Sequence, residues 1–175
     1  MNAVVGVARA LDFAARKHAG QRRKGLMAEP YVNHLTEVAL LLAETTDGDD
    51  PALVMAGLLH DTIEDTDTTR DELAGVFGED VASLVAEVTD DTSLDRESRK
   101  RIQVETAPAK SRRARMIKIA DKVANLRSIA ESPPVGWSPR RKREYVAWAR
   151  EVVAACGDTN SRLEKLFDDA VRAQP

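Results

Sequence analysis

Apolar residues recur every three or four positions along most of the chain, and no stretch shows the strict apolar/polar alternation that marks a half-buried strand. This interval places apolar side chains on one face of a helix, so the fold class is predicted to be all-α. The predicted helices lie within residues 3–20, 31–45, 51–65, 70–77, 79–88, 95–105, 114–130, 139–156 and 160–171.

Several predicted helix ends carry residues that satisfy free backbone groups. Asp50 precedes Pro51, which suits a first helical turn because its missing N–H would have no partner there. Thr69 and Glu72 have the spacing of a capping box, and Gly78 is placed to end the helix that they begin. These signals fix helix boundaries near residues 50, 69 and 78.

The composition is typical of one helical domain. Hydrophobic residues make up 43% of the 175 residues but aromatic residues only 4%, so the core must be mainly Ala, Leu, Val and Ile. A chain of this length buries about two-thirds of the surface that it exposes when unfolded. With no internal repeat and no linker-like segment, residues 1–175 are expected to form a single domain.

Charge and cysteine content limit the partners and the compartment. The net charge of −3 argues against a nucleic-acid partner, because proteins that bind nucleic acid usually carry a large positive excess. The single cysteine, Cys156, cannot form an intramolecular disulfide, and the chain shows no secretory leader and no long uncharged apolar run. We therefore expect a cytoplasmic protein without membrane contact; the sequence does not indicate its oligomeric state.

Two segments interrupt the helical pattern. Residues 20–30, GQRRKGLMAEP, form a basic loop, and residues 131–137, ESPPVGW, form a connection broken by prolines. Loops carried on a rigid helical frame are common places for binding residues. Both segments are therefore candidates for contact with a ligand.

The stretch LLHDTIEDT, residues 58–66, places one imidazole and three carboxylates directly after apolar residues. If the third helix continues through this stretch, the polar residues share one side of it, because each residue turns a helix by about 100°. Carboxylates packed this closely are costly to bury unless a cation compensates them. A metal ion is the simplest such cation, and a solvated helix end is the structural alternative. The polar residues are His60, Asp61, Glu64 and Asp65.

Two further residues complete a candidate set of metal ligands. His34 lies near the start of the second helix, and Asp121 interrupts an apolar period in MIKIADKVANL. With His60 and Asp61 they supply two nitrogens and two oxygens, a mixture that suits Mn²⁺, Fe²⁺ or Zn²⁺ better than Mg²⁺ or Ca²⁺. Four protein ligands on a six-coordinate ion leave positions for water and substrate, as in a metal-dependent hydrolase.

Each of these residues also has a structural alternative. His34 could be a hydrogen-bonded core histidine, and Asp121 could pair with Lys118 or Lys122. His18 lies beside the basic loop, and we interpret it as a structural residue that anchors this loop and not as a fifth ligand.

These motifs resemble those of the HD-domain phosphohydrolases, named for their adjacent His-Asp pair, and more closely those of the alarmone hydrolases related to RelA and SpoT. The segment HAGQRRKGLMAEPYVNHLTEVA resembles the basic loop and first metal histidine of that family. LLHDTIEDT resembles its central motif, and KIADKVANLR resembles its Asp-bearing helix. Stand-alone small alarmone hydrolases, including the animal SpoT homologue, are similar in VAEVTDD and GWSPRRKREYVAWA. The resemblance covers nearly the entire chain.

The resemblance implies a single HD-domain helical bundle with one Mn²⁺ per chain bound between helices. Its implied activity, in the stringent response, is hydrolysis of guanosine 3′,5′-bis(diphosphate), ppGpp, or of pppGpp. Cleavage at the 3′ position would give GDP or GTP and pyrophosphate. The implied metal ligands are His34, His60, Asp61 and Asp121.

Glu64 and Asp65 match the catalytic acidic pair of the family. They lie one helical turn beyond the His-Asp pair, close enough to orient or deprotonate a water molecule beside the metal, an effect worth about 10²- to 10⁴-fold in rate. Which of the two is the base stays open, and a cap of the helix end is the structural alternative.

The resemblance also assigns substrate contacts. Arg23 and Lys24 match the nucleotide-contacting loop, where a guanidinium can stack on a purine and an ammonium can bind phosphate. Asn125 lies one turn after Asp121 on the same helix face and could contact sugar or phosphate beside the metal. Four further positions match residues that line the nucleotide site: Arg96, Trp137, Arg141 and Tyr145.

The sequence departs from the family in one loop and leaves two other functions open. KGLMAEPY lacks the small, turn-forming residues common in the family at this place. No synthetase or regulatory domain precedes Pro175, so we expect hydrolysis without synthesis. One alternative is a hydrolase for another 3′- or 2′-phosphorylated nucleotide, such as an adenine alarmone or NADPH. The other is a non-catalytic module that binds alarmone, which would be expected to lack a ligand or an acid that is present here.

Overall fold

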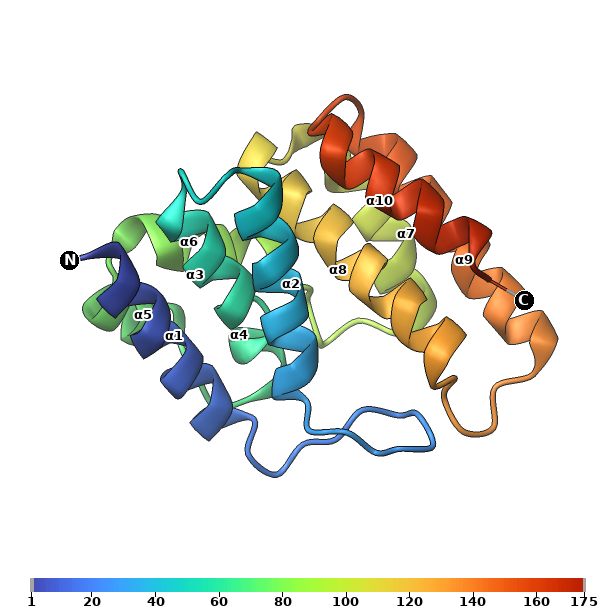
Figure 1. Cartoon of the computed structure of the whole chain (residues 1–175), viewed down its shortest axis with the longest axis horizontal. Coiled ribbons are helices and arrows are strands. Elements are labelled where there is room, and N and C mark those ends of the chain that lie inside the picture. Colours follow the sequence, from blue (N-terminus) through green and yellow to red (C-terminus); the bar gives the residue numbers. More distant parts are fainter. Residues whose placement is uncertain (1, 175) are drawn as a thin grey trace.

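The computed structural model describes residues 2–174 as helices joined by loops, which confirms the all-α prediction (Figure 1). Met1 and Pro175, the ends of the predicted single domain, lie outside the described residues. The elements are α1 (Ala3–Lys17), α2 (Val32–Thr45), α3 (Pro51–Leu59), α4 (Thr62–Asp65), α5 (Arg70–Phe77), α6 (Glu79–Val88), α7 (Arg96–Thr106), the 3₁₀ turn η1 (Ala107–Ala109), α8 (Arg112–Glu131), α9 (Pro139–Cys156) and α10 (Ser161–Arg172).

The predicted caps begin and end the helices. Asp50 Oδ1 accepts a hydrogen bond from a backbone N–H in the first turn of α3, at 3.0 Å. Thr69 Oγ1 accepts from the N–H of Glu72 at 3.1 Å, and Gly78, with φ of 89°, ends α5. The carboxylate of Glu72, the second residue of the predicted capping box, forms an ion pair with Lys17 of α1. This ion pair connects α5 to α1.

Helix α8 is the centre of the bundle. It packs against α2, α3, α6, α9 and α10 and lies between the two groups of helices seen at left and right in Figure 1. Its buried residues face more than one side, and Ile117, Ile119 and Leu126 are among the most completely buried side chains of the chain. The core is aliphatic, as the composition predicted. No helix within residues 2–174 has both the length and the hydropathy that a bilayer crossing requires.

The end of α3 differs from the prediction. Helix α3 stops at Leu59, and His60 and Asp61 form a turn before α4 begins at Thr62, so the assumption of one continuous helix was wrong. Side chains take the carbonyls that a longer helix would use: His60 Nδ1 lies 2.8 Å from Gly57 O, and Thr62 Oγ1 donates to Leu59 O at 2.6 Å. Helix α3 also has no polar face, because every residue from Leu53 to Leu59 is buried.

The two non-helical segments meet at one end of the bundle. Helix α1 stops at Lys17, before the predicted end near Gly20, and residues 20–30 then fold back on themselves. Their tip lies against residues 131–137, the connection between α8 and α9 (Figure 1). The loops identified from the sequence therefore form one continuous structure.

The close packing of α3 against α2 predicts a sensitive position at Gly57. A Cβ there would lie 2.6 Å from Leu42 Cδ1, and Leu42 is fully buried and cannot turn away freely. We expect Gly57→Val to lower the free energy of unfolding by about 1 to 3 kcal/mol through overpacking. Gly75→Val is the matched control, since a Cβ at this exposed position in α5 meets no described atom within 4 Å. Urea denaturation would measure both; equal stabilities would contradict the prediction.

Candidate metal centre and adjoining cavity

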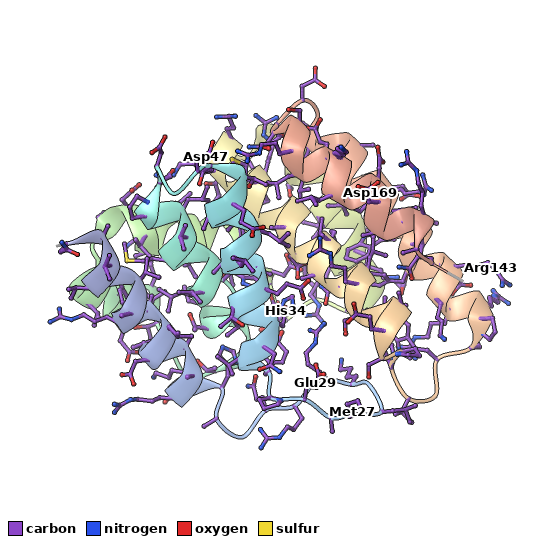
Figure 2. The ribbon with its side chains drawn as sticks, viewed as in Figure 1. Met27, Glu29, His34, Asp47, Arg143 and Asp169 are labelled. Carbon is purple, nitrogen blue, oxygen red and sulfur yellow. The ribbon has the colours of Figure 1, made fainter. Side chains whose placement is uncertain are left out.

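Two histidines and two aspartates meet where α2, the α3–α4 turn and α8 come together. Figure 2 shows His34 on α2, near the middle of the molecule. His34 Nε2 lies 3.2 Å from Asp121 Oδ1, and His60 Nε2 lies 3.1 Å from Asp61 Oδ2. The two opposite pairs, His34 with Asp61 and His60 with Asp121, are 3.7 and 3.8 Å apart. The structure thus brings together the four residues that were predicted as ligands from three separate parts of the chain.

The hydrogen bonding of His60 fits metal binding. Its Nδ1 lies 2.8 Å from the backbone oxygen of Gly57, and because a carbonyl can only accept, Nδ1 carries a proton. The buried Nε2 then faces Asp61 and Asp121 and has no hydrogen-bond partner among the described residues. A lone pair beside two carboxylates needs either a second proton or a cation, and a divalent ion would satisfy His34, His60 and Asp121, whose ligand atoms lie within 4.8 Å of one another.

The electrostatics of the cluster favour a cation. Burial alone would lower the pKa of His60, but Asp61 and Asp121 outweigh burial and raise this pKa to about 10. Burial would raise the pKa of both carboxyl groups, yet His60 holds the pKa of Asp61, and Lys122 the pKa of Asp121, well below the ordinary range. Burial lowers the pKa of His34. The carboxylates are therefore ionised, as metal ligands must be.

Neighbouring side chains hold each carboxylate in place. Tyr31 Oη donates to Asp61 Oδ2 at 2.7 Å. Asn125 Nδ2 donates to Asp121 Oδ1 at 2.7 Å, and Lys122 Nζ donates to Asp121 Oδ2 at 2.8 Å. The pairing of Asp121 with Lys122, first considered as a structural alternative, therefore occurs together with the approach to the histidines. Such supporting contacts orient ligands before an ion arrives.

The acidic pair on α4 faces the same space. Glu64 and Asp65 line a cavity of about 180 Å³ together with all four residues of the cluster. Glu64 Oε2 accepts from the backbone N–H of Asp90 at 3.2 Å, and Arg99 Nη1 lies 3.3 Å from Glu64 Oε1. Burial raises the pKa of both acids, with further contributions from the charge of Asp90 on Glu64 and of Asp61 on Asp65. A raised pKa makes a carboxylate a stronger base near neutral pH.

A second cavity, of about 350 Å³, adjoins the first. Seven cationic side chains line it against only two acids, counted over the described residues, which suits a multiply charged anion. Aromatic rings form part of its wall and offer surfaces for stacking a flat ligand. The cations are Arg22, Arg23, Lys24, Arg96, Arg99, Lys100 and Lys122; the rings are Tyr31, Trp137, Tyr145 and Trp148. The walls shared by both cavities are Tyr31, Glu64, Asp90, Gln103 and Asn125.

Most residues predicted to contact substrate line this second cavity. They are Arg23, Lys24, Arg96, Asn125, Trp137 and Tyr145. Arg23 Nη2 donates to Asn125 Oδ1 at 2.8 Å, which joins the basic loop to the histidine–aspartate cluster. Arg141 lies outside this lining: its guanidinium covers the Trp137 ring at 4.6 Å, and it lines the neighbouring groove between α7 and α9. Its contact with the cavity therefore runs through Trp137.

Sequence reasoning predicted only Arg96 among the residues that α7 contributes to the cavity. Arg99, Lys100 and Gln103 line the cavity beside Arg96, and Trp148 of α9 donates from Nε1 to Lys100 O at 3.1 Å. The signal was present, because these four α7 residues have the i, i+3, i+4, i+7 spacing of one helix face. In a helix so rich in charge, however, this face could not be told from a solvated one.

His18 anchors the basic loop, as predicted. It is buried, its Nδ1 lies 2.6 Å from Gln21 Oε1, and its ring stacks on Tyr31 with centroids 5.1 Å apart. Gln21 in turn donates from Nε2 to the backbone oxygen of Asp65 at 2.8 Å. The start of the loop is thereby fixed to the acidic pair.

Comparisons of this chain with a family model, with known proteins and with solved structures agree on one family. A family model described as HD domain matches residues 10–149. The chain is 44% identical over 162 residues to guanosine-3′,5′-bis(diphosphate) 3′-pyrophosphohydrolase MESH1 of Drosophila melanogaster, covering 93% of this chain and 90% of that protein. It is 49% identical over 156 residues to MESH1 of Homo sapiens, covering 89% and 87%. The solved structure of a metazoan ortholog of SpoT that hydrolyses ppGpp is similar, with a TM-score of 0.91 and 43% identity over 95% of this chain and 94% of that one.

Loss of Asp121 should remove metal binding without unfolding the chain. We expect the unaltered protein to bind one Mn²⁺ per chain and Asp121→Ala to retain less than a tenth of it by elemental analysis. Excess Mn²⁺, at 100 times its Kd, should raise the free energy of unfolding of the unaltered protein by about 2.7 kcal/mol and leave Asp121→Ala unchanged. Asp158→Ala, at an exposed loop position, serves as the control. Full metal occupancy in Asp121→Ala would refute this ligand assignment.

Proposed function

The chain belongs to the HD-domain family, and we propose from this membership that it is a metal-dependent hydrolase that removes pyrophosphate from the 3′ position of ppGpp, giving GDP, and from pppGpp, giving GTP. One observation supports the choice of this substrate. The cavity at the histidine–aspartate cluster shares five wall residues with a cavity that seven cationic side chains line, counted over the described residues. A nucleotide with two pyrophosphate groups could place one group beside a metal ion in the cluster and the other among the cationic side chains.

We propose His34, His60, Asp61 and Asp121 as the ligands of one Mn²⁺. Two imidazoles and two carboxylates form a donor set that a mid-row transition metal accepts and that Mg²⁺ or Ca²⁺ would not prefer. The Nε2 atoms and carboxylate oxygens already face one another across a few ångströms. When bound, the ion would polarise a phosphoryl oxygen and activate a water nucleophile.

The cationic cavity would hold the remote part of the nucleotide. Lys24 and Lys100 can bind the 5′ phosphates, while Arg23, beside Asn125, stands between the two ends of the site. The rings of Trp137 and Tyr145 provide an apolar wall for the purine, with centroids 5.8 Å apart. Binding energy from these contacts would orient the 3′ group beside the metal cluster.

The acidic pair would carry the proton transfer. In the hydrolysis, the oxygen of water forms a bond to the phosphorus next to the ribose 3′ oxygen, and the bond from that phosphorus to the 3′ oxygen breaks. Glu64 or Asp65 accepts a proton from the water, and the departing 3′ oxygen gains one. Glu64 is part of the wall shared by the two cavities, where Arg99 and the Asp90 N–H hold it, so its position suits this role.

Neutralising the acidic pair should separate chemistry from metal binding. We expect Glu64→Gln and Asp65→Asn each to keep the metal, and at least one of them to lower kcat for ppGpp by about 10²-fold or more, because the proton acceptor is lost. Steady-state kinetics and elemental analysis on the same preparations would test this. Near-normal kcat in both variants would show that neither acid serves the chemistry.

A panel of nucleotides tests the proposed substrate. With Mn²⁺ present, ppGpp should yield GDP and pyrophosphate in equal amounts, while GTP and GDP remain intact because they lack a 3′ phosphate. NADPH and an adenosine 3′,5′-bis(diphosphate) belong in the panel, since stacking on Arg23 or Trp137 tolerates any purine. Rapid hydrolysis of either one with ppGpp untouched would replace the proposed substrate, and binding of ppGpp without turnover would leave a non-catalytic binding module.

A further inference from the structure

The basic loop is a short hairpin. Its backbone pairs across the turn, with the N–H of Tyr31 donating to Gln21 O at 3.1 Å and the N–H of Arg23 donating to Glu29 O at 2.8 Å. Figure 2 shows Met27 at the far end of this hairpin. These bonds join the two arms of the hairpin near its base, and its tip reaches the connection between α8 and α9 (Figure 1).

The tip of the hairpin docks on the connection between α8 and α9. Gly25 forms an antiparallel bridge with Pro134, and the N–H of Val135 donates to the carbonyl of Lys24 at 2.9 Å. These contacts are made by backbone atoms, so they hold the two segments at one fixed separation. The start of the connection is held by the end of α8, because the N–H of Ser132 donates to Ser128 O at 2.8 Å.

The docking contact has room only for glycine. A Cβ at Gly25 would overlap both the backbone oxygen and the hydroxyl oxygen of Ser132, and would lie 3.1 Å from its Cβ. Because the backbone oxygen of Ser132 is fixed by the end of α8, the hairpin tip would have to move. Gly20, in the same segment, differs: a Cβ there meets no described atom within 4 Å.

Residues on both docked segments face the cationic cavity. Arg23 and Lys24 come from the hairpin, Pro134 and Trp137 from the connection, and Gly25 itself is part of the lining. One wall of the cavity is therefore assembled from two loops that touch each other through backbone contacts at Gly25. If this contact is lost, the cations and the Trp137 ring no longer keep a fixed spacing.

We propose that Gly25 is a positioning residue for substrate: its close contact with Ser132 holds the hairpin and the connection together as one wall of the nucleotide cavity. This inference rests on the proposed function only in taking ppGpp as the ligand. Undocking should raise KM, because the cavity wall binds the remote part of the nucleotide. It should spare the metal and change kcat less, because the cluster and the acidic pair lie on α2, α4, α8 and the α3–α4 turn.

The first test compares two identical substitutions within one segment. Gly25→Ala should raise KM for ppGpp at least tenfold, with kcat within threefold and Mn²⁺ content unchanged, while Gly20→Ala should behave like the unaltered protein. A calorimetric Kd for ppGpp without added metal should rise in parallel with KM. This Kd keeps the inference testable if ppGpp binds but is not turned over, an outcome that would remove the proposed activity alone.

The second test breaks the same contact from the other side. Val135→Pro removes the N–H that bonds Lys24 O, whereas Val135→Ala keeps it and changes only an exposed side chain. Val135→Pro should raise KM and Kd for ppGpp at least tenfold, and it should speed tryptic cleavage after Arg22, Arg23 or Lys24 at least fivefold. Val135→Ala should change none of these three quantities by more than twofold. If Gly25→Ala fails to fold, this pair decides the question.

Two results would overturn the proposal. One is normal KM and Kd in both Gly25→Ala and Val135→Pro. The other is faster tryptic cleavage of the hairpin in Val135→Pro with KM and Kd unchanged, which would show that the contact orders the loop without positioning substrate.

Discussion

Two half-buried carboxylates and two buried imidazoles lie together where α2, the α3–α4 turn and α8 meet, beside a mainly aliphatic core. Burial of ionised groups is costly unless opposite charges and hydrogen bonds compensate it. Here Tyr31, Asn125 and Lys122 hold the carboxylates, and the carbonyl of Gly57 fixes the ring of His60. The helices around the cluster must therefore keep fixed positions, because a small shift would separate a half-buried carboxylate from the groups that compensate its charge.

This requirement explains the break between α3 and α4. A continuous helix would use the Gly57 carbonyl for its own backbone, but here the His60 ring takes it and the chain turns. The turn allows α3 to be buried on all sides, while α4 carries Glu64 and Asp65 out toward the cavity. Two hydrogen bonds to backbone oxygens thus separate the buried helix α3 from α4, which carries the acidic pair.

Two rows of polar residues, one on α8 and one on α7, extend the site beyond the histidine–aspartate cluster. On α8, Lys118, Asp121, Lys122 and Asn125 repeat at helical spacing within a buried helix, and on α7 the row from Arg96 to Gln103 does the same in a polar one. The first row stood out in the sequence because acids and amides break an apolar pattern. The second did not, because charged residues surround it, and only its packing beside α9 shows which face meets the cavity.

The sequence by itself determined the fold class, nearly all helix boundaries and the residues of the histidine–aspartate cluster, because apolar spacing, caps such as Asp50 and misplaced polar residues such as Asp121 are local signals. Tertiary structure alone decided where α3 ends, that Arg141 lies outside the cavity lining and covers Trp137, and that the hairpin tip docks beside Ser132. Each of these depends on atoms from segments far apart in the chain, or on a side chain replacing a backbone donor. No spacing rule encodes the distance between Gly25 and the end of α8, since this distance is set by how the whole bundle packs.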